Sequence, residues 1–250
     1  MKKEDFKEIL NTIENDDIEK FAERVLDMAP AYWYSVPASS TGKYHPSYAL
    51  GDGGLVRHTM ALLRIMNHMF NVASFKELFT SRERDLLRVA GLAHDMMKSG
   101  TQDEYEKSKW TKFEHPILAA RMIQDIDGLS KDEKIFIGKA IASHMGEWNT
   151  DKRSSAILPT PSDKYQILLH LCDYLASRKD IEVVFDNVPT SVQEETPDIN
   201  TWKFTFGKYA GMTIPEVAEK DKGYISWAKS NMEKEPAKTL LKNFKFKEAS

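Results

Sequence analysis

Histidine and aspartate residues recur on the apolar faces of helix-like segments, and this pattern constrains the fold more than any other feature. In Leu55–Phe70 the apolar residues return at the spacing of one buried helical face, and His58 lies on that face. His144 follows the apolar residues of a later segment, and Asp173 lies inside the periodic stretch Leu169–Ala176. Burying an unpaired imidazole or carboxylate is costly, so these side chains need partners, and divalent cations are the most economical ones.

Apolar periodicity predicts helices throughout the first 180 residues, separated by short polar turns. For the last of them, Thr160 is a candidate cap, Pro161 suits the first helical position, and Asp163 stands where a capping-box acid would. The expected helices are Leu55–Phe70, Arg82–Met97, Pro116–Ile126, Lys131–Met145 and Pro161–Ser177.

The segment Asp186–Asn200 has two prolines, four acidic residues and little periodicity, which predicts a linker. Beyond it, Trp202–Phe206 alternates like a short strand, Gly207–Gly211 supplies turn residues, and a helix is expected around Tyr224–Asn231. The fold class is therefore an all-α core followed by a small α+β module. The expected domains are N-terminal helices over 1–36, the main helical domain over 37–181, a linker over 182–200 and a basic, aromatic module over 201–250.

Composition favours a water-soluble protein, with 41% hydrophobic and 29% charged residues. The start lacks the apolar run of a signal peptide, and no apolar run is long enough to span a membrane, so we expect a cytoplasmic protein. The single Cys172 excludes an internal disulfide and is expected to be a small core residue. From Thr201 to Ser250, ten Lys stand against six acidic residues, a balance of +4 within a chain of net charge −3. Only this tail has the charge that attracts phosphates.

Five motifs follow one another between roughly Pro37 and Arg178. Their succession resembles the HD superfamily of metal-dependent phosphohydrolases, and within it is most similar to the HD domain of YhaM-type 3′-to-5′ exoribonucleases. The resemblance implies an all-helical core around one or two metal ions that hydrolyses phosphate esters. The motifs are Gly53-Gly54-Leu-Val-Arg-His58-Thr59, Leu92-Ala-His94-Asp95-Met-Met-Lys98, Glu114-His115-Pro116, Ser143-His144-Met-Gly146 and Leu171-Cys-Asp173-Tyr-Leu-Ala176.

The same resemblance implies a role for each ligand. Asp95 would bridge two ions, and Lys98, one turn after His94, would contact a phosphate oxygen as a point charge. Mixed imidazole and carboxylate ligands suit Mn, Fe, Ni or Zn, with Mg also open, better than an all-oxygen calcium site. Two such ions would activate a bridging water and neutralise charge on the phosphoryl group. The first ion would be held by His58, His94, Asp95 and Asp173, and the second by Asp95, His115 and His144.

The tail from Phe206 to Trp227 is similar to a C-terminal module of exodeoxyribonuclease X-like and phage proteins, which suggests a nucleic-acid context. Its aromatic and basic residues either stack on bases and neutralise phosphates or form the core of the module, and the sequence leaves both open. These residues are Trp202, Phe204, Tyr209 and Trp227 with Lys203, Lys208 and Lys229.

Three histidines are left outside the ligand set. His68 and His170 are expected to be packing or surface residues, whereas His45 either lines the site mouth or is a simple loop residue.

The leading hypothesis is an enzyme that cleaves phosphodiester or phosphate ester bonds, including a 3′-to-5′ exonuclease acting on single-stranded nucleic acid. A close alternative is a small-nucleotide phosphohydrolase, such as a nucleotidase, a dNTP triphosphohydrolase, or a dinucleoside or cyclic nucleotide hydrolase. Further alternatives are a non-catalytic nucleotide sensor and a metal-free helical protein with buried polar networks. The sequence does not determine the oligomeric state.

Overall fold

Helices make up nearly all the regular structure of the computed structural model, which describes residues 1–39, 45–181, 198–204, 207–232 and 237–246. By its internal contacts the chain divides into two compact units, residues 1–190 and 191–250. The domain boundaries expected from the sequence remain a prediction. The predicted all-helical core is confirmed.

The first unit opens with short helices: η1 (Lys3–Phe6), α1 (Lys7–Leu10), α2 (Asp16–Asp27), η2 (Ala31–Tyr34) and η3 (Ser47–Ala49). Their apolar side chains belong to the same core as the later helices, and Phe6 stacks on Trp33 with ring centroids 5.4 Å apart. Asp85, fully buried on a later helix, accepts hydrogen bonds from the backbone amides of Glu14 and Asn15 at the start of α2. The N-terminal helices are therefore part of the unit that carries the histidines.

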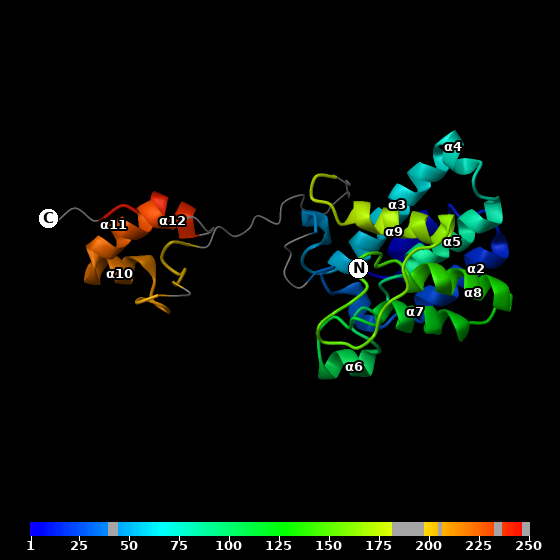
Figure 1. Cartoon of the computed structure of the whole chain (residues 1–250), viewed down its shortest axis with the longest axis horizontal. Helices are drawn as coiled ribbons and strands as arrows, with labels where there is room; N and C mark the ends of the chain where they lie inside the picture. The colour runs from blue at the N-terminus through cyan, green and yellow to red at the C-terminus, as the bar shows by residue number, and fades with distance from the viewer. Residues whose placement is uncertain (40–44, 182–197, 205–206, 233–236, 247–250) are drawn as a thin grey trace. The chain divides into compact units, whose positions relative to one another are not determined.

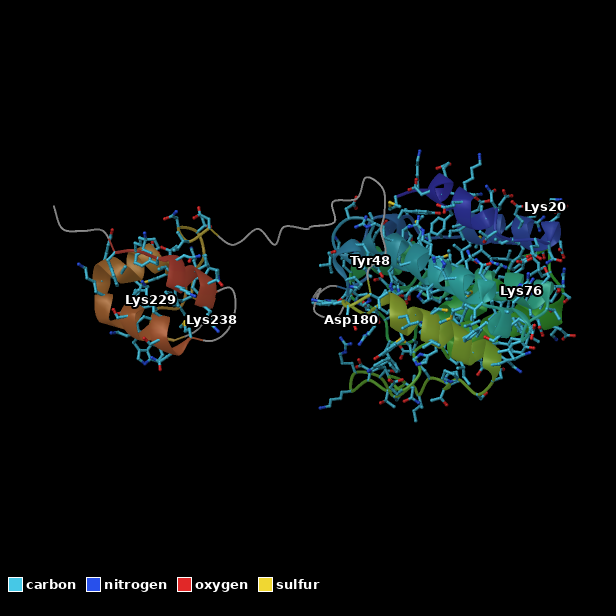
Figure 2. The ribbon with its side chains drawn as sticks, turned by 90° about the horizontal axis from the view of Figure 1, so that it is seen from above. Lys20, Tyr48, Lys76, Asp180, Lys229 and Lys238 are labelled. Atoms are coloured by element: carbon cyan, nitrogen blue, oxygen red, sulfur yellow. The ribbon has the colours of Figure 1, made fainter. Side chains whose placement is uncertain are left out.

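Seven further helices complete this unit: α3 (Gly54–Asn71), α4 (Ala73–Lys76), α5 (Ser81–Ala93), α6 (Gln102–Lys107), α7 (His115–Gln124), α8 (Lys131–Ala142) and α9 (Lys164–Ala176). Helix α3 packs on α5 and α9, and α8 packs on α5, α7 and α9 (Figure 1). Tyr48 and Lys76 lie near opposite ends of α3 (Figure 2). The Tyr48 hydroxyl donates to the carbonyl of Ala176 at 2.7 Å, which ties the entry to α3 to the end of α9.

Local capping signals place most helix starts. Thr80, Thr101 and Ser130 each form a capping box with the glutamate three residues later. The expected start of α9 is wrong: Asp163 is the cap, its carboxylate accepts from the amides of Tyr165 and Gln166, and Pro161 precedes the helix. Aspartate is a strong cap by itself, so no capping box is required there.

Two of the helices end three or four residues earlier than expected, and both endings matter for the site. Helix α5 stops at Ala93 rather than Met97, and α8 stops at Ala142 rather than Met145. His94, Asp95 and His144 consequently lie in turns just beyond helix ends. Cys172 is buried in the core as expected, and burial raises the pKa of its thiol.

The second unit contains α10 (Ile214–Lys220), α11 (Lys222–Asn231) and α12 (Ala237–Asn243). Its core includes Phe204, Ile214 and Leu241. Among its described residues the only extended pairing is an isolated bridge between Lys203 and Thr213, so the expected α+β character is not confirmed. Part of the expected strand, residues 205–206, lies outside the described residues.

None of the helices in the described part of the chain combines the length and the apolar character needed to cross a membrane.

Candidate metal centre

Six ionisable side chains from separate segments of the first unit converge on one site. Five of them are at most 3% exposed, and the Asp173 side chain is 21% exposed. Because they belong to α3, α5, α7, α8 and α9 or to the turns beside them, packing of these helices assembles the site (Figure 1). They are His58 in α3, His94 and Asp95 directly after α5, His115 at the start of α7, His144 just after α8, and Asp173 in α9.

Asp95 lies at the centre of the group. Its Oδ1 atom is 2.9 Å from Nε2 of His115 and 3.7 Å from Nε2 of His144. Its Oδ2 atom is 3.6 Å from Nε2 of His94. One carboxylate therefore faces three imidazoles that come from three different segments.

Asp173 extends the cluster on the other side of His94. Its Oδ1 atom is 2.9 Å from Nε2 of His58 and 3.6 Å from Nε2 of His94. His94 thus faces both carboxylates. The six residues form three overlapping sets of three in which the potential ligand atoms lie within 4.8 Å of one another. The structure therefore brings together every ligand predicted from the sequence.

Three of the imidazoles, those of His94, His115 and His144, are oriented in the same way. Each donates its Nδ1–H to the backbone carbonyl three residues earlier in the chain. This bond fixes the tautomer and presents the Nε2 lone pair to the cluster, as in histidines that bind metals. The acceptors are Gly91, Lys112 and Ile141, at 2.8, 2.7 and 2.8 Å.

The protonation states of the site favour a bound cation. Burial alone would raise the pKa of Asp95, but Lys98 and His94 outweigh it and hold that pKa well below its ordinary range. The pKa of Asp173 is likewise held low, because the hydrogen bond from His58 and the electrostatic influence of His94 outweigh its burial. Burial lowers the pKa of His115, so its Nε2 carries a lone pair beside an anionic oxygen. Both carboxylates are therefore ionised and face neutral or positive partners.

Several atoms of the cluster have no hydrogen-bond partner, although they are buried. They include Nε2 of His94, Nε2 of His115 and Oδ1 of Asp95. The His115 and Asp95 atoms are only 2.9 Å apart, yet their geometry is not that of a hydrogen bond. Two acceptors at this distance repel each other unless a cation is shared between them. The residues present therefore fit one or two divalent ions.

Lys98 stands between the cluster and the adjacent cavity. Its Nζ donates to Oδ2 of Asp95 at 2.5 Å, and its side chain is 16% exposed. The turn that carries it is fixed by Tyr32 of η2, whose hydroxyl accepts from the amide of Ser99 and donates to the carbonyl of Gly100 at 2.8 Å. Sequence patterns did not indicate a role for Tyr32, because its partners are more than sixty residues away.

A cavity of about 550 Å³ opens beside the cluster. Its lining combines predicted site residues with others, among them aromatic and cationic residues, that the sequence did not single out. In the sequence these residues lie close to predicted ligands: Trp148 follows His144 by four residues, and Tyr174 follows Asp173 directly. The lining residues are His45, His58, Asp95, Lys98, His144, Met145, Trp148, Asp173, Tyr174, Ser177 and Arg178.

His170 has a role that the sequence interpretation missed. Its Nδ1–H donates to the carbonyl of His144 at 2.7 Å, which holds the turn carrying that ligand. Gly146 in the same turn has φ +59°, and a Cβ there would lie 2.2 Å from the His170 ring. Only glycine fits this position. The available signal was the spacing of three residues between His170 and Asp173, which places both on one helical face.

The other two histidines outside the ligand set, His45 and His68, have different environments. His45 lines the cavity, with its ring centroid 5.3 Å from that of His58, which agrees with the expectation that it lines the site mouth rather than that of a simple loop residue. Burial lowers the pKa of His45 to about 3. His68 is exposed on α3, as expected.

In the C-terminal module most of these aromatic residues form or contact the core, and their stacking on bases stays a prediction. Phe204 is buried in the core, and Trp202 and Tyr209 pack against it. Trp227 is 53% exposed. The ammonium group of Lys229 lies over the rings of Phe244 and Phe246, and Lys208 pairs with Asp221. Trp227 is thus the member of this set best placed to meet a ligand.

Comparison with known proteins agrees with this geometry. Residues 56–178 match the family model of the HD domain, and residues 204–233 match that of the exodeoxyribonuclease X-like C-terminal domain. Searches of curated proteins and of solved structures found no significant match. Residues 56–178 therefore form an HD domain, and the chain also carries an exodeoxyribonuclease X-like C-terminal module. An HD domain implies a metal-dependent phosphohydrolase.

Proposed function

We propose that this phosphohydrolase cleaves phosphodiester or phosphate ester bonds of nucleic acid or nucleotides, with 3′-to-5′ cleavage of single strands as the leading activity. The observation that carries the proposal is the set of buried imidazole Nε2 atoms turned toward the carboxylates of Asp95 and Asp173. The C-terminal match supports a nucleic-acid substrate. The exposed lysines of that module have the charge needed to hold a phosphate backbone.

The proposed ligands divide into two overlapping sets. Imidazole with carboxylate suits Mn, Fe, Ni or Zn, and Mg also accepts the carboxylates. When bound, divalent ions supply a water of lowered pKa and neutralise charge on phosphoryl oxygens. His58, His94, Asp95 and Asp173 would hold one ion, and Asp95, His115 and His144 a second.

The chain's own residues prepare the site for a phosphate. Asp95 is kept ionised, and the backbone carbonyls that hold His94, His115 and His144 preserve their tautomers. Lys98 reaches both Asp95 and the cavity, so its ammonium would orient a phosphoryl oxygen and offset its charge. Because these groups are fixed before substrate arrives, little reorganisation is needed during the reaction.

The cavity itself favours a second candidate, a small-nucleotide phosphohydrolase. A volume of about 550 Å³ lies within the range of small-molecule sites and accommodates a mononucleotide. Both candidates use the same six ligands and differ only in what the rest of the substrate contacts.

Metal content tests the proposal directly. Purified protein is expected to hold one to two equivalents of transition metal by elemental analysis, and chelation should abolish hydrolysis until metal is restored. His115→Ala should lower the metal content, whereas His68→Ala, which changes an exposed histidine on α3, should leave it unchanged. Undiminished hydrolysis by metal-free protein would contradict the proposal.

A further inference from the structure

Arg178 lies on the cavity wall without a carboxylate partner among the described residues. Its Nη2 donates to the hydroxyl of Ser177 at 3.1 Å, its guanidinium lies 4.3 Å from the centroid of the Tyr174 ring, and its buried Nε atom has no hydrogen-bond partner. By contrast, Arg82 and Arg153 are paired with carboxylates. A guanidinium that is oriented but not neutralised is suited to a phosphate.

Trp148 stands on the same wall. Its ring is nearly parallel to that of Tyr174, at an angle of 10° with centroids 6.0 Å apart, and its centroid lies 6.2 Å from that of His170. The residue is nevertheless 48% exposed. An indole that is supported on one side and open on another is a ready platform for a nucleobase, because little side-chain freedom is lost on stacking.

The wall is joined rigidly to the metal centre. Tyr174 directly follows Asp173 on α9, and Trp148 lies four residues beyond His144 in the turn that His170 holds. A substrate whose phosphate reaches Asp95 would therefore meet these aromatic and cationic groups within the same cavity of about 550 Å³.

We propose that this wall is a nucleoside subsite in which Trp148 stacks on the base and Arg178 binds a second phosphate that is not cleaved. The inference rests on the proposed function and specifies its substrate: a nucleoside with at least two phosphate groups. A polynucleotide and a nucleoside polyphosphate share this chemistry.

Two esters with the same p-nitrophenolate leaving group, one with a base and one without, measure the contribution of the base to binding. Trp148→Ala should raise the KM for thymidine 5′-(p-nitrophenyl phosphate) by about tenfold, in line with the loss of one stacked base. Hydrolysis of methyl p-nitrophenyl phosphate, which has no base, should be unchanged, and Trp148→Phe should restore much of the difference. Trp110→Ala is the control, because Trp110 is 69% exposed and is not part of the cavity lining. Equal losses on both esters, or no loss on the thymidine ester, would overturn the assignment of Trp148.

A second phosphate isolates Arg178. The wild-type protein should show one of two preferences for a second phosphate. Faster hydrolysis of a 5′-phosphorylated thymidine dinucleotide than of the same dinucleotide without its 5′-phosphate represents a polynucleotide substrate, and faster hydrolysis of thymidine 5′-triphosphate than of thymidine 5′-monophosphate represents a polyphosphate. Arg178→Gln should reduce that preference by about tenfold, the effect of one hydrogen-bonded charge pair, while Arg153→Gln should not. The substrate that is preferred shows whether the second phosphate belongs to a polynucleotide or to a nucleoside polyphosphate. If Arg178→Gln behaves as wild type on both, the phosphate assignment is wrong.

Calorimetric binding of thymidine 5′-monophosphate separates this inference from the proposed function. If the wild-type protein hydrolyses none of the esters, the proposed function fails, but the affinity for the nucleotide still tests the subsite. Weaker binding by Trp148→Ala than by Trp110→Ala supports it, and equal affinities overturn it.

Discussion

The two units of this chain bury different kinds of side chain. In the first unit the interior holds ionisable groups such as Asp85, Arg88, His94 and Asp95 beside a large apolar core. In the described part of the second unit the buried residues are apolar apart from Thr213, which caps α10. The lysines in the described part of this unit are exposed, including Lys229 and Lys238 (Figure 2).

This difference corresponds to the different requirements of catalysis and of nucleic-acid binding. Hydrolysis of a phosphate ester needs charges that have been taken out of water and fixed in place, and such charges cost stability unless they are matched. Adhesion to a phosphate backbone needs only a stable support and an exposed positive surface. We therefore expect the first unit to be the catalytic domain and the second to be a binding module.

The largest expected effect comes from the centre of the first unit. Asp95→Asn should reduce hydrolysis by at least about a hundredfold, because it removes a carboxylate charge facing His94, His115 and His144. Initial rates and metal content measure the effect, and circular dichroism should show that most helices remain. Asp151→Asn, in a loop where Asp151 pairs with Arg153, is the matched control. Normal turnover by Asp95→Asn would contradict the assignment of catalysis to this site in the first unit.

Gly146→Ala tests the turn that carries His144. A Cβ would meet the His170 ring at 2.2 Å in a left-handed backbone conformation, so we expect roughly a tenfold loss of activity and about 1–3 kcal/mol of stability. Gly51→Ala is the control, since Gly51 has φ +67° and nothing within 4 Å of the added Cβ. It should show the backbone cost in thermal unfolding without the loss of activity. Equal kinetics for the two variants would show that crowding at His170 is unimportant.

Removal of the residues after Asn200 tests the binding role of the second unit. The KM for single-stranded oligonucleotides should rise several-fold, to at most about tenfold, and its salt dependence should become flatter because fewer counterions are released. Hydrolysis of methyl p-nitrophenyl phosphate should be unaffected. An unchanged KM for oligonucleotides would contradict the expected role of the second unit in binding nucleic acid.

The smallest expected effect concerns acid stability of the first unit. Burial would raise the pKa of Glu133, but hydrogen bonds from Ser130 and Arg82 outweigh it and lower that pKa, and the hydrogen bond from Arg82 also lowers the pKa of Asp17. Carboxyl groups with lowered pKa stabilise the fold above their unfolded pKa and lose this contribution as the pH falls through the folded pKa. The stability difference between wild type and Arg82→Ala should therefore be present at neutral pH and shrink below the ordinary glutamate pKa of 4.5.

Because solvent screens these partly exposed groups, that difference should be below about 1 kcal/mol. Thermal unfolding between neutral and acidic pH measures it. Parallel curves for the two proteins would contradict the assignment of the shift to Arg82.

The sequence by itself determined the helical class of the first unit and, through its resemblance to the HD superfamily, which six residues to expect as metal ligands. The capping boxes that begin at Thr80, Thr101 and Ser130 depend on residues three apart, so they can be recognised from the sequence without the tertiary structure. The position of polar residues such as His58 and Asp173 on apolar stripes likewise indicates that they face the interior, although not which residues they contact. The strand expected at Trp202–Phe206 is not confirmed, since its described part forms only an isolated bridge at Lys203. Short alternating patterns also suit a loop whose aromatic side chain enters the core, as that of Phe204 does.

Only the tertiary structure decided which polar residues share the site and what surrounds it. His58 and Asp173 are 115 residues apart in the chain and 2.9 Å apart in space, because α3 packs on α9. The support of His144 by His170 and the wall of Trp148, Tyr174 and Arg178 depend on the same packing. Local periodicity reports which face of a helix is buried, but the partner across the interface is fixed by the packing of whole helices.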